Sequence, residues 1–97
     1  MGAFMIIQAD VTNPERFREY AMRTPAVVAE YGGRYRCMRG ELELLEGPAD
    51  DRKIVVSEWP SMDAARAFWN SDAYAELKKL REGAADVSVY LCEITAD

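Results

Sequence analysis

The sequence predicts a single α+β domain over residues 1–97, of the ferredoxin-like type. In this fold a four-stranded antiparallel sheet, with strand order 4-1-3-2, carries two helices on one face. Three observations support the prediction. The length suits one domain, without a linker or a repeat. Strand-like runs and helical patterns follow one another in the order β-α-β-β-α-β. Finally, β-α-β crossovers are right-handed, which selects this strand order.

The first third of the chain contains one predicted strand and one predicted helix. Residues 3–11, AFMIIQADV, form a short apolar run before a turn, which is typical of a buried strand. A helix begins after Asn13, a favourable N-cap, with Pro14 at its first position. Apolar residues then recur every three or four positions. Pro25 predicts a kink within this helix, and the glycine pair at 32–33 ends it.

Three further segments are predicted strands. Residues 34–40 alternate in polarity, residues 53–59 form a run that ends at a proline, and residues 86–94 form the last strand. Segment 41–47, ELELLEG, also alternates, and we expect it to continue the preceding strand or to pair with it. The residues that follow, GPADD, are typical of a turn.

The second helix lies between the last two strands. Ser61 is its predicted N-cap. Asn70 and Ser71 interrupt the helical pattern and predict a second cap, so that Asp72 lies in a new first turn. The last turn is basic, which suits the negative end of the helix dipole, and Gly83 ends the helix.

Both faces of the predicted sheet are apolar. In the first strand Phe4 and Ile6 point to one side, whereas Met5 and Ile7 point to the other. An antiparallel sheet with one face in water normally has polar side chains on that face. Since helices cover only one face here, we expect a second copy to cover the other, giving a two-fold homodimer.

The composition argues against several classes of function. The net charge of −5 and the dispersed basic residues do not favour binding to nucleic acid or to anionic membranes. No apolar run approaches the roughly 20 residues that span a bilayer, and the first residues do not form a signal peptide, so we expect a cytoplasmic location. There is no histidine, and Cys37 and Cys92 are far apart, so neither a metal nor another cofactor is expected.

Two stretches carry a resemblance to a known family. They are YGGRYRCMRGELELLEG at 31–47 and VVSEWPSMDAARAFWNSDAYAELKKLR at 55–81. In order and spacing they resemble the domain-of-unknown-function 1330 family, which belongs to the dimeric α+β barrel superfamily. The resemblance implies two four-stranded sheets packed face to face in a dimer. It implies no activity. Relatives in the wider superfamily include cofactor-free monooxygenases and haem-handling enzymes, but a shared fold alone does not transfer these functions.

Arg39 and Glu58 are the first candidate site residues. Arg39 matches the Arg-Gly pair of the family pattern, and its guanidinium is suited to holding a carboxylate or an enolate. The alternative is that it protects an edge strand together with Arg34 and Arg36. Glu58 is the candidate general base, because a partly buried carboxylate late in a strand can accept a proton. The alternative is an ion pair of Glu58 with Arg39 or Arg81.

The segment WNSDAYAELKKLREG, residues 69–83, supplies the other candidates. Trp69 and Tyr74 are expected either in the core, with their polar tips at its edge, or in the wall of a pocket. Ser71 has a sufficient role as a helix cap, and without a histidine nothing activates it as a nucleophile. Arg81, the distal arginine of the family pattern, completes the set of ligand-binding candidates.

These residues lead to three functional hypotheses. The first is a cofactor-independent enzyme that acts on a small organic acid or aromatic compound, with Glu58 as base, Arg39 as anion clamp and Tyr74 as hydrogen-bond donor. The second is a non-catalytic binder of a small ligand, and the third is a dimer whose role is protein association. The first two require a pocket between the helices and the half of the sheet near the second strand.

Overall fold

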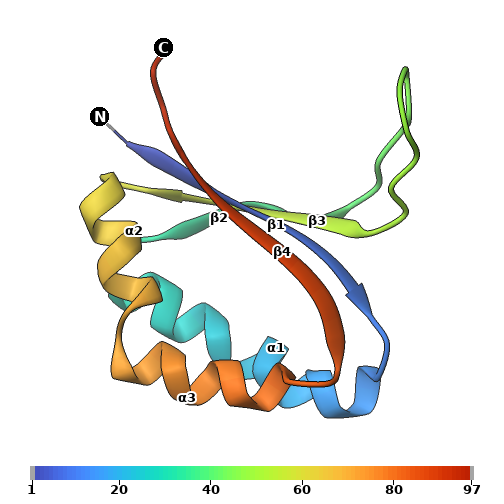
Figure 1. Cartoon of the computed structure of the whole chain (residues 1–97). Helices are drawn as coiled ribbons and strands as arrows, with labels where there is room; N and C mark the ends of the chain where they lie inside the picture. Colours follow the sequence, from blue (N-terminus) through green and yellow to red (C-terminus); the bar gives the residue numbers. More distant parts are fainter. Residues whose placement is uncertain (1, 97) are drawn as a thin grey trace.

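The computed structural model describes residues 2–96 and has three helices on one side of a four-stranded sheet (Figure 1). The predicted element order is confirmed, except that the second predicted helix is divided in two at Asn70 and Ser71, where a new cap was expected. The elements are β1 (Ala3–Val11), α1 (Pro14–Glu30), β2 (Arg34–Gly40), β3 (Lys53–Trp59), α2 (Met62–Trp69), α3 (Asp72–Arg81) and β4 (Ala85–Glu93).

The four strands pair antiparallel in the order β2-β3-β1-β4, which is the predicted order 4-1-3-2 read from the other edge. Within this chain the sheet stays open and does not close into a barrel. Ile7 in β1 lies opposite Val55 in β3 and opposite Val89 in β4. These residues point to the same side, toward the helices, which we call the inner face. Ile6 and Val56 form another pair and belong to the outer face, which no helix covers.

The helices begin at side-chain caps, as the sequence predicts. Asn13 Oδ1 accepts a hydrogen bond from the backbone N–H of Arg16 over 3.1 Å, at the start of α1. Ser61 Oγ accepts one from the backbone N–H of Ala64 over 3.0 Å, at the start of α2. Each cap provides a partner for a backbone donor that the first helical turn leaves free. Within residues 2–96, none of the three helices combines the length and the hydropathy needed to cross a bilayer.

The proline in α1 does not end the helix. α1 runs as one element through Pro25. The hydroxyl of Thr24 donates to the carbonyl oxygen of Tyr20, one turn earlier in the helix, over 2.6 Å. This contact turns the buried Thr24 side chain back along the helix and satisfies its hydroxyl internally.

The segment between β2 and β3 is a loop rather than a strand. The expectation that residues 41–47 continue β2 or pair with it is therefore wrong. Pairing with β3 ends at Gly40, opposite Ile54, so the residues beyond this point have no strand opposite them. The loop projects from the sheet on the side away from the helices (Figure 1). Three of its apolar side chains are exposed: Leu42, Leu44 and Leu45.

The hydrophobic core is concentrated at one end of the molecule, where β3 leads into α2. Trp59 is 2% exposed, and its ring centroid lies 4.9 Å from that of Phe68 in α2. The indole N–H of Trp59 donates to Ser57 Oγ over 2.9 Å, so this buried donor has a partner. Contacts between the helices and the sheet come mainly from α2, whereas α1 packs chiefly against α3. The helical layer is therefore held tightly to the sheet at this end only.

Gly33 allows the packing at this end to be tested. A Cβ atom at Gly33 would lie 2.7, 2.8 and 2.8 Å from three carbon atoms of the Trp59 ring. We expect Gly33→Ala to lower the free energy of unfolding by about 1–3 kcal/mol, because an over-packed core must shift to make room. Urea denaturation of Gly33→Ala in the natural and in the Trp59→Phe background measures the coupling. The loss of stability caused by Gly33→Ala should be smaller in the Trp59→Phe background, because the phenyl ring is smaller than the indole. An equal loss in both backgrounds would show that the Trp59 ring is not the cause.

Candidate functional site

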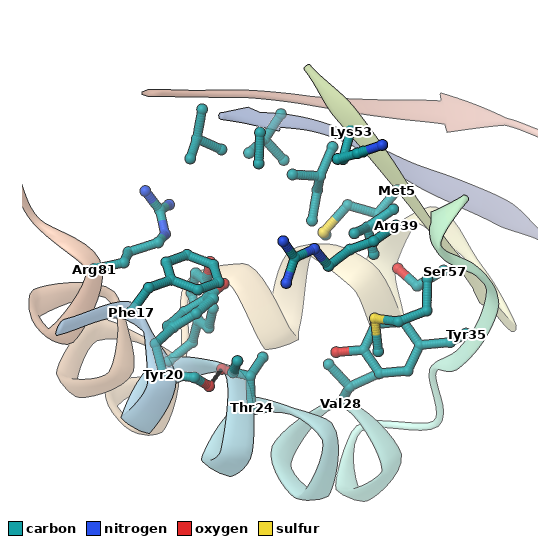
Figure 2. A pocket seen from close by; sticks show the side chains of 18 of the residues that line it. Met5, Phe17, Tyr20, Thr24, Val28, Tyr35, Arg39, Lys53, Ser57 and Arg81 are labelled. Atoms are coloured by element: carbon teal, nitrogen blue, oxygen red, sulfur yellow. Dashed lines mark hydrogen bonds between the residues drawn. The ribbon is translucent and has the colours of Figure 1, made fainter. Parts of the chain in front are cut away.

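A cavity of about 110 Å³ lies between the inner face of the sheet and the helices (Figure 2). Side chains of β1, β3 and β4 form one wall, and α1 and α3 provide much of the other. Most of the lining is apolar, including Met5, Ile7, Phe17, Val55 and Val89. A mainly apolar cavity with a few polar groups is the usual form of a site for a small ligand.

The charged side chains around the cavity all have the same sign. Arg39 near the end of β2, Lys53 at the start of β3 and Arg81 at the end of α3 line it, and no Asp or Glu among the described residues does. The chain as a whole has 17 acidic and 12 basic residues, so the cavity is opposite in charge to the protein around it. An anionic ligand would therefore be attracted to this space.

Arg81 lies beside two phenols at one end of the cavity. The hydroxyl oxygens of Tyr20 in α1 and Tyr74 in α3 are 2.9 Å apart, and either hydroxyl can be the donor. The guanidinium carbon of Arg81 lies 5.7 Å from the centroid of the Tyr20 ring, within the range of a cation–π contact. Arg81 Nε is the one buried side-chain nitrogen or oxygen of residues 2–96 without a hydrogen-bond partner. An acceptor supplied by a ligand would remove the cost of this unpaired donor.

Burial determines the protonation of this group of residues. It raises the pKa of Tyr20 well above the ordinary value, and the neighbouring oxygen of Tyr74 adds to the shift. It also raises the pKa of Tyr35 to about 12. For Arg81, burial disfavours the charge, but the phenol oxygens of Tyr74 and Tyr20 outweigh burial and raise the pKa. At neutral pH the cavity therefore contains neutral Tyr20 and Tyr35 phenols beside a charged guanidinium.

Arg39 reaches the cavity because the edge strand is irregular there. The pairing of β2 with β3 shifts between Met38 and Gly40, and Arg39 lies in this bulge. Its φ of 59° makes it the one described residue other than glycine with a left-handed backbone. For an L-residue this conformation costs about 1–2 kcal/mol. The bulge redirects the side chain, and the guanidinium points into the cavity (Figure 2).

Glu58 lies on the outer face and does not line the cavity. Its Oε1 is 3.7 Å from Arg34 Nη2 and 3.5 Å from Arg36 Nε. The expected convergence of Glu58 with Arg39 in one pocket is therefore not found, and its ion-pair partners are not Arg39 or Arg81. The physical reason is that successive side chains of β3 point to opposite faces of the sheet. Ser57 and Trp59 point to the inner face, so Glu58 between them points to the outer face.

Trp69 and Ser71 lie next to the cavity residue Tyr74 but do not line the cavity themselves. Ser71 Oγ accepts a hydrogen bond from the backbone N–H of Tyr74 over 3.1 Å and donates to the carbonyl oxygen of Phe68 over 2.7 Å. The Trp69 ring centroid lies 5.1 Å from that of Tyr74, and Lys78 Nζ lies 4.4 Å from the Trp69 ring. Both residues therefore hold Tyr74 in position at the start of α3.

The cavity thus contains three of the six candidate residues, namely Arg39, Tyr74 and Arg81. Three more of its polar residues were not candidates: Tyr20, Tyr35 and Lys53. Two of these had a signal in the sequence. Helical periodicity places Tyr20 on the inward side of its helix, and strand alternation places Lys53 on the same side as Val55. The sequence did not indicate that this side of the helix and this side of the strand line a common cavity.

No group of three or more His, Cys, Asp or Glu residues is arranged to hold a metal ion within residues 2–96. Cys37 and Cys92 are free thiols. They lie in β2 and β4, at opposite edges of the sheet, so they do not pair within the chain.

A family model described as domain of unknown function (DUF1330) matches residues 2–95. The chain belongs to the DUF1330 family. This match confirms the resemblance seen in the sequence and extends over nearly the whole domain. The description of the family assigns no activity. No match was found among curated proteins.

Solved structures show how widely this fold occurs. A protein of unknown function from Rhodopseudomonas palustris is similar in structure: it is 22% identical, with a TM-score of 0.75 over 99% of this chain and 84% of that one. SnoaB, a cofactor-independent oxygenase from Streptomyces nogalater, is 17% identical, with a TM-score of 0.72 over 99% and 95% of the two chains. A hypothetical Arabidopsis thaliana protein is 16% identical, with a TM-score of 0.66 over 98% and 89%. At these identities the likeness establishes the fold of the chain alone.

The raised pKa values of Tyr20 and Tyr35 predict a loss of stability in alkali. Each phenol holds its proton more tightly in the folded chain than in the unfolded chain, where the pKa is about 10. The resulting stabilisation is complete below pH 10 and is lost as the pH rises above it. We expect the free energy of unfolding in urea to fall between about pH 10 and 12.

The Tyr20→Phe variant should show a smaller fall over this interval, because it lacks the more strongly shifted phenol. Tyr31→Phe provides the control, since Tyr31 at the end of α1 is only partly buried and does not line the cavity. The same fall in the natural protein and in both variants would contradict the assignment to the buried phenol.

Proposed function

We propose that this DUF1330 protein is a cofactor-independent enzyme that binds a small organic acid or phenol as an anion between the sheet and the helices. One observation carries the proposal. An apolar cavity of about 110 Å³ is lined by Arg39, Lys53 and Arg81, and by none of the acidic side chains in residues 2–96. Arg81 is partly buried and its Nε has no partner within residues 2–96, and the exposed Arg39 and Lys53 add positive charge at the edge of the same space, so an anion bound there would be stabilised.

The energetics favour an ionised ligand over a neutral one. A carboxylate that leaves water for an apolar cavity needs charged hydrogen-bond donors, and a guanidinium offers them in a planar fork. A neutral ligand of the same shape would leave Arg81 Nε without an acceptor strong enough to offset the desolvation of both partners. We therefore expect the charge of the ligand, more than its exact shape, to decide binding.

The same residues support chemistry on an enolate or phenolate. Arg81 and the phenols of Tyr20 and Tyr74 are positioned to stabilise negative charge that develops on a ligand oxygen. Cofactor-independent oxygenation fits this environment. In such a reaction dioxygen takes up the electrons of a bound carbanion, so that a CH₂ group becomes a carbonyl and the second oxygen atom leaves as water. SnoaB, which shares the fold, is described as an oxygenase of this type.

The second candidate function is binding without turnover. It is favoured by the position of Glu58, the predicted general base, which lies on the other face of the sheet from the cavity. Because no carboxylate of residues 2–96 lines the cavity, an enzyme of this design would release the proton of its ligand to solvent. Oxygen consumption with a bound, enolisable acid separates the two functions, since a pure binder consumes none.

The proposal includes a homodimer formed through the outer face, in the cytoplasm, without a nucleic-acid or membrane partner. The outer face supports it, because Phe4, Ile6, Ile54 and Val56 are apolar, only partly buried and not covered by any helix (Figure 1). A second sheet packed on this face would bury these side chains in a two-layered core of the usual thickness of about 10 Å.

Matched pairs of acids and amides test the anion proposal. We expect benzoate or 2-naphthoate to raise the melting temperature, whereas benzamide or 2-naphthamide should not, because only the acids neutralise the cavity. At 100 times the dissociation constant a ligand adds about 2.7 kcal/mol of stability. For a domain of this size that corresponds to a shift of about 10–20 °C. Differential scanning fluorimetry measures the shift.

Two arginine variants provide the comparison. Arg39→Gly should lose most of the acid-induced shift, while glycine accepts the φ of 59° at this position without strain. Arg66→Ala removes an arginine that is paired with Asp63 on α2, away from the cavity, and should keep the shift. Equal responses to acids and amides, or an equal loss in both variants, would contradict the proposal.

The dimer prediction is tested by sedimentation equilibrium at micromolar concentration. We expect twice the chain mass of 11.0 kDa for the natural protein and the monomer mass for Val56→Lys, because a lysine at this position would be buried between two sheets. Met22→Lys is the control, since Met22 is 73% exposed on α1. A monomeric natural protein would overturn the prediction.

A further inference from the structure

The cavity has two separate positions for negative charge. Arg81 enters it from the end of α3, and Arg39 enters it from the bulge in β2 (Figure 2). The two guanidinium groups point into the space from different sides, with apolar side chains such as Met5 around them. A single carboxylate on a short ligand can occupy one of these positions but leaves the other unused.

The position at Arg81 is equipped with donors that have no acceptor. The hydroxyls of Tyr20 and Tyr74 are 2.9 Å apart, so one of them donates to the other. The second hydroxyl proton has no acceptor among the hydrogen bonds formed by residues 2–96. Arg81 Nε, which is buried, has no partner there either. A ligand oxygen at this place would accept hydrogen bonds from both a phenol and a guanidinium.

The position at Arg39 differs in exposure and in the kind of donor. The Arg39 residue as a whole is exposed, and Lys53 also lines this part of the sheet wall (Figure 2). Two cations near solvent suit a group that is fully ionised in water and remains partly hydrated when bound, which describes a carboxylate. The buried position suits a single oxygen that accepts hydrogen bonds from a phenol and a guanidinium, because these donors and the charge of Arg81 counter the effect of burial on a negative charge that develops there.

We propose that the ligand carries two oxygen functions on one small apolar frame, a carboxylate held by Arg39 and a phenol or enol oxygen held by Arg81 and the Tyr20–Tyr74 pair. This inference rests on the proposed function and narrows the ligand class from organic acids in general to hydroxyaryl or enolisable oxo acids. It also places the phenol or enol oxygen of the ligand at the buried position. Negative charge on this oxygen is shared with the neighbouring carbon of the enolate or phenolate, which is the carbon that reacts.

Hydroxybenzoates and methylbenzoates form the matched test, because a hydroxyl and a methyl group have similar size. Isothermal titration calorimetry of the 2-, 3- and 4-isomers covers the range of spacings between the two oxygen functions. We expect at least one hydroxybenzoate to bind at least tenfold more tightly than the methylbenzoate of the same geometry. The bound ligand should also show the red-shifted absorption of a phenolate at pH 7, where the free phenol is not ionised.

Variants assign the preference to the residues. Tyr74→Phe and Tyr20→Phe should each abolish most of the tenfold preference and leave the affinity for the methylbenzoate within about twofold. Arg39→Gly should weaken both members of the pair by a similar factor. Two phenol variants are used so that the failure of one to fold does not remove the test.

The outcomes separate the two levels of the proposal. If methylbenzoates bind in an Arg39-dependent manner but no hydroxyl gives a preference or a phenolate spectrum, the two-point inference is wrong and the anion-binding function stands. If no benzoate of either series binds, the proposed function itself is contradicted. A hydroxyl preference that survives in both phenol variants would also overturn the assignment of the buried position.

Discussion

The attachment of the helical layer to the sheet at one end is the constraint on which the rest of the structure depends. Trp59, packed against Gly33 and Phe68, holds α2 on the sheet, while α1 and α3 chiefly contact each other. The space left beneath them is about 110 Å³. Apolar side chains that border this space are packed on one side only, so they lose dispersion contacts that a filled core would provide. A bound ligand would restore these contacts. The tight packing at Trp59 therefore leaves room for a ligand under α1 and α3.

Charge is distributed in the same asymmetric way. Acidic residues outnumber basic ones in the chain, but the cavity is lined by cations only. The one partly buried carboxylate that was expected to balance them, Glu58, is neutralised on the outer face by Arg34 and Arg36. Glu58 therefore does not neutralise the cations of the cavity, and the charges of Arg39 and Arg81 remain available to a ligand. Separation of the two faces by a single sheet is what allows this.

Much of the fold follows from the sequence, because caps, turns and periodicity act locally. The caps at Asn13, Ser61 and Ser71 and the strand order are where the pattern predicts them. The site was predicted in part. Since both faces of the sheet are apolar, alternation alone could not tell which face the helices cover, and Glu58 was placed with Arg39 on the wrong side. The loop at 41–47 alternates like a strand, but a strand also needs a partner, which the pattern does not contain.

The binding of an anion between the sheet and the helices is tested most directly by NMR of the arginine side chains. The Nε–H resonances of the protein are followed while 2-naphthoate is added. Arg39 should shift because it binds the carboxylate, and Arg81 should shift along the same saturation curve because the naphthalene ring lies in the cavity that both residues line. Arg34 and Arg36, which are paired with Glu58 on the outer face, should not move. Shifts confined to Arg34 and Arg36, or a bound naphthoate that moves neither Arg39 nor Arg81, would contradict the site described here.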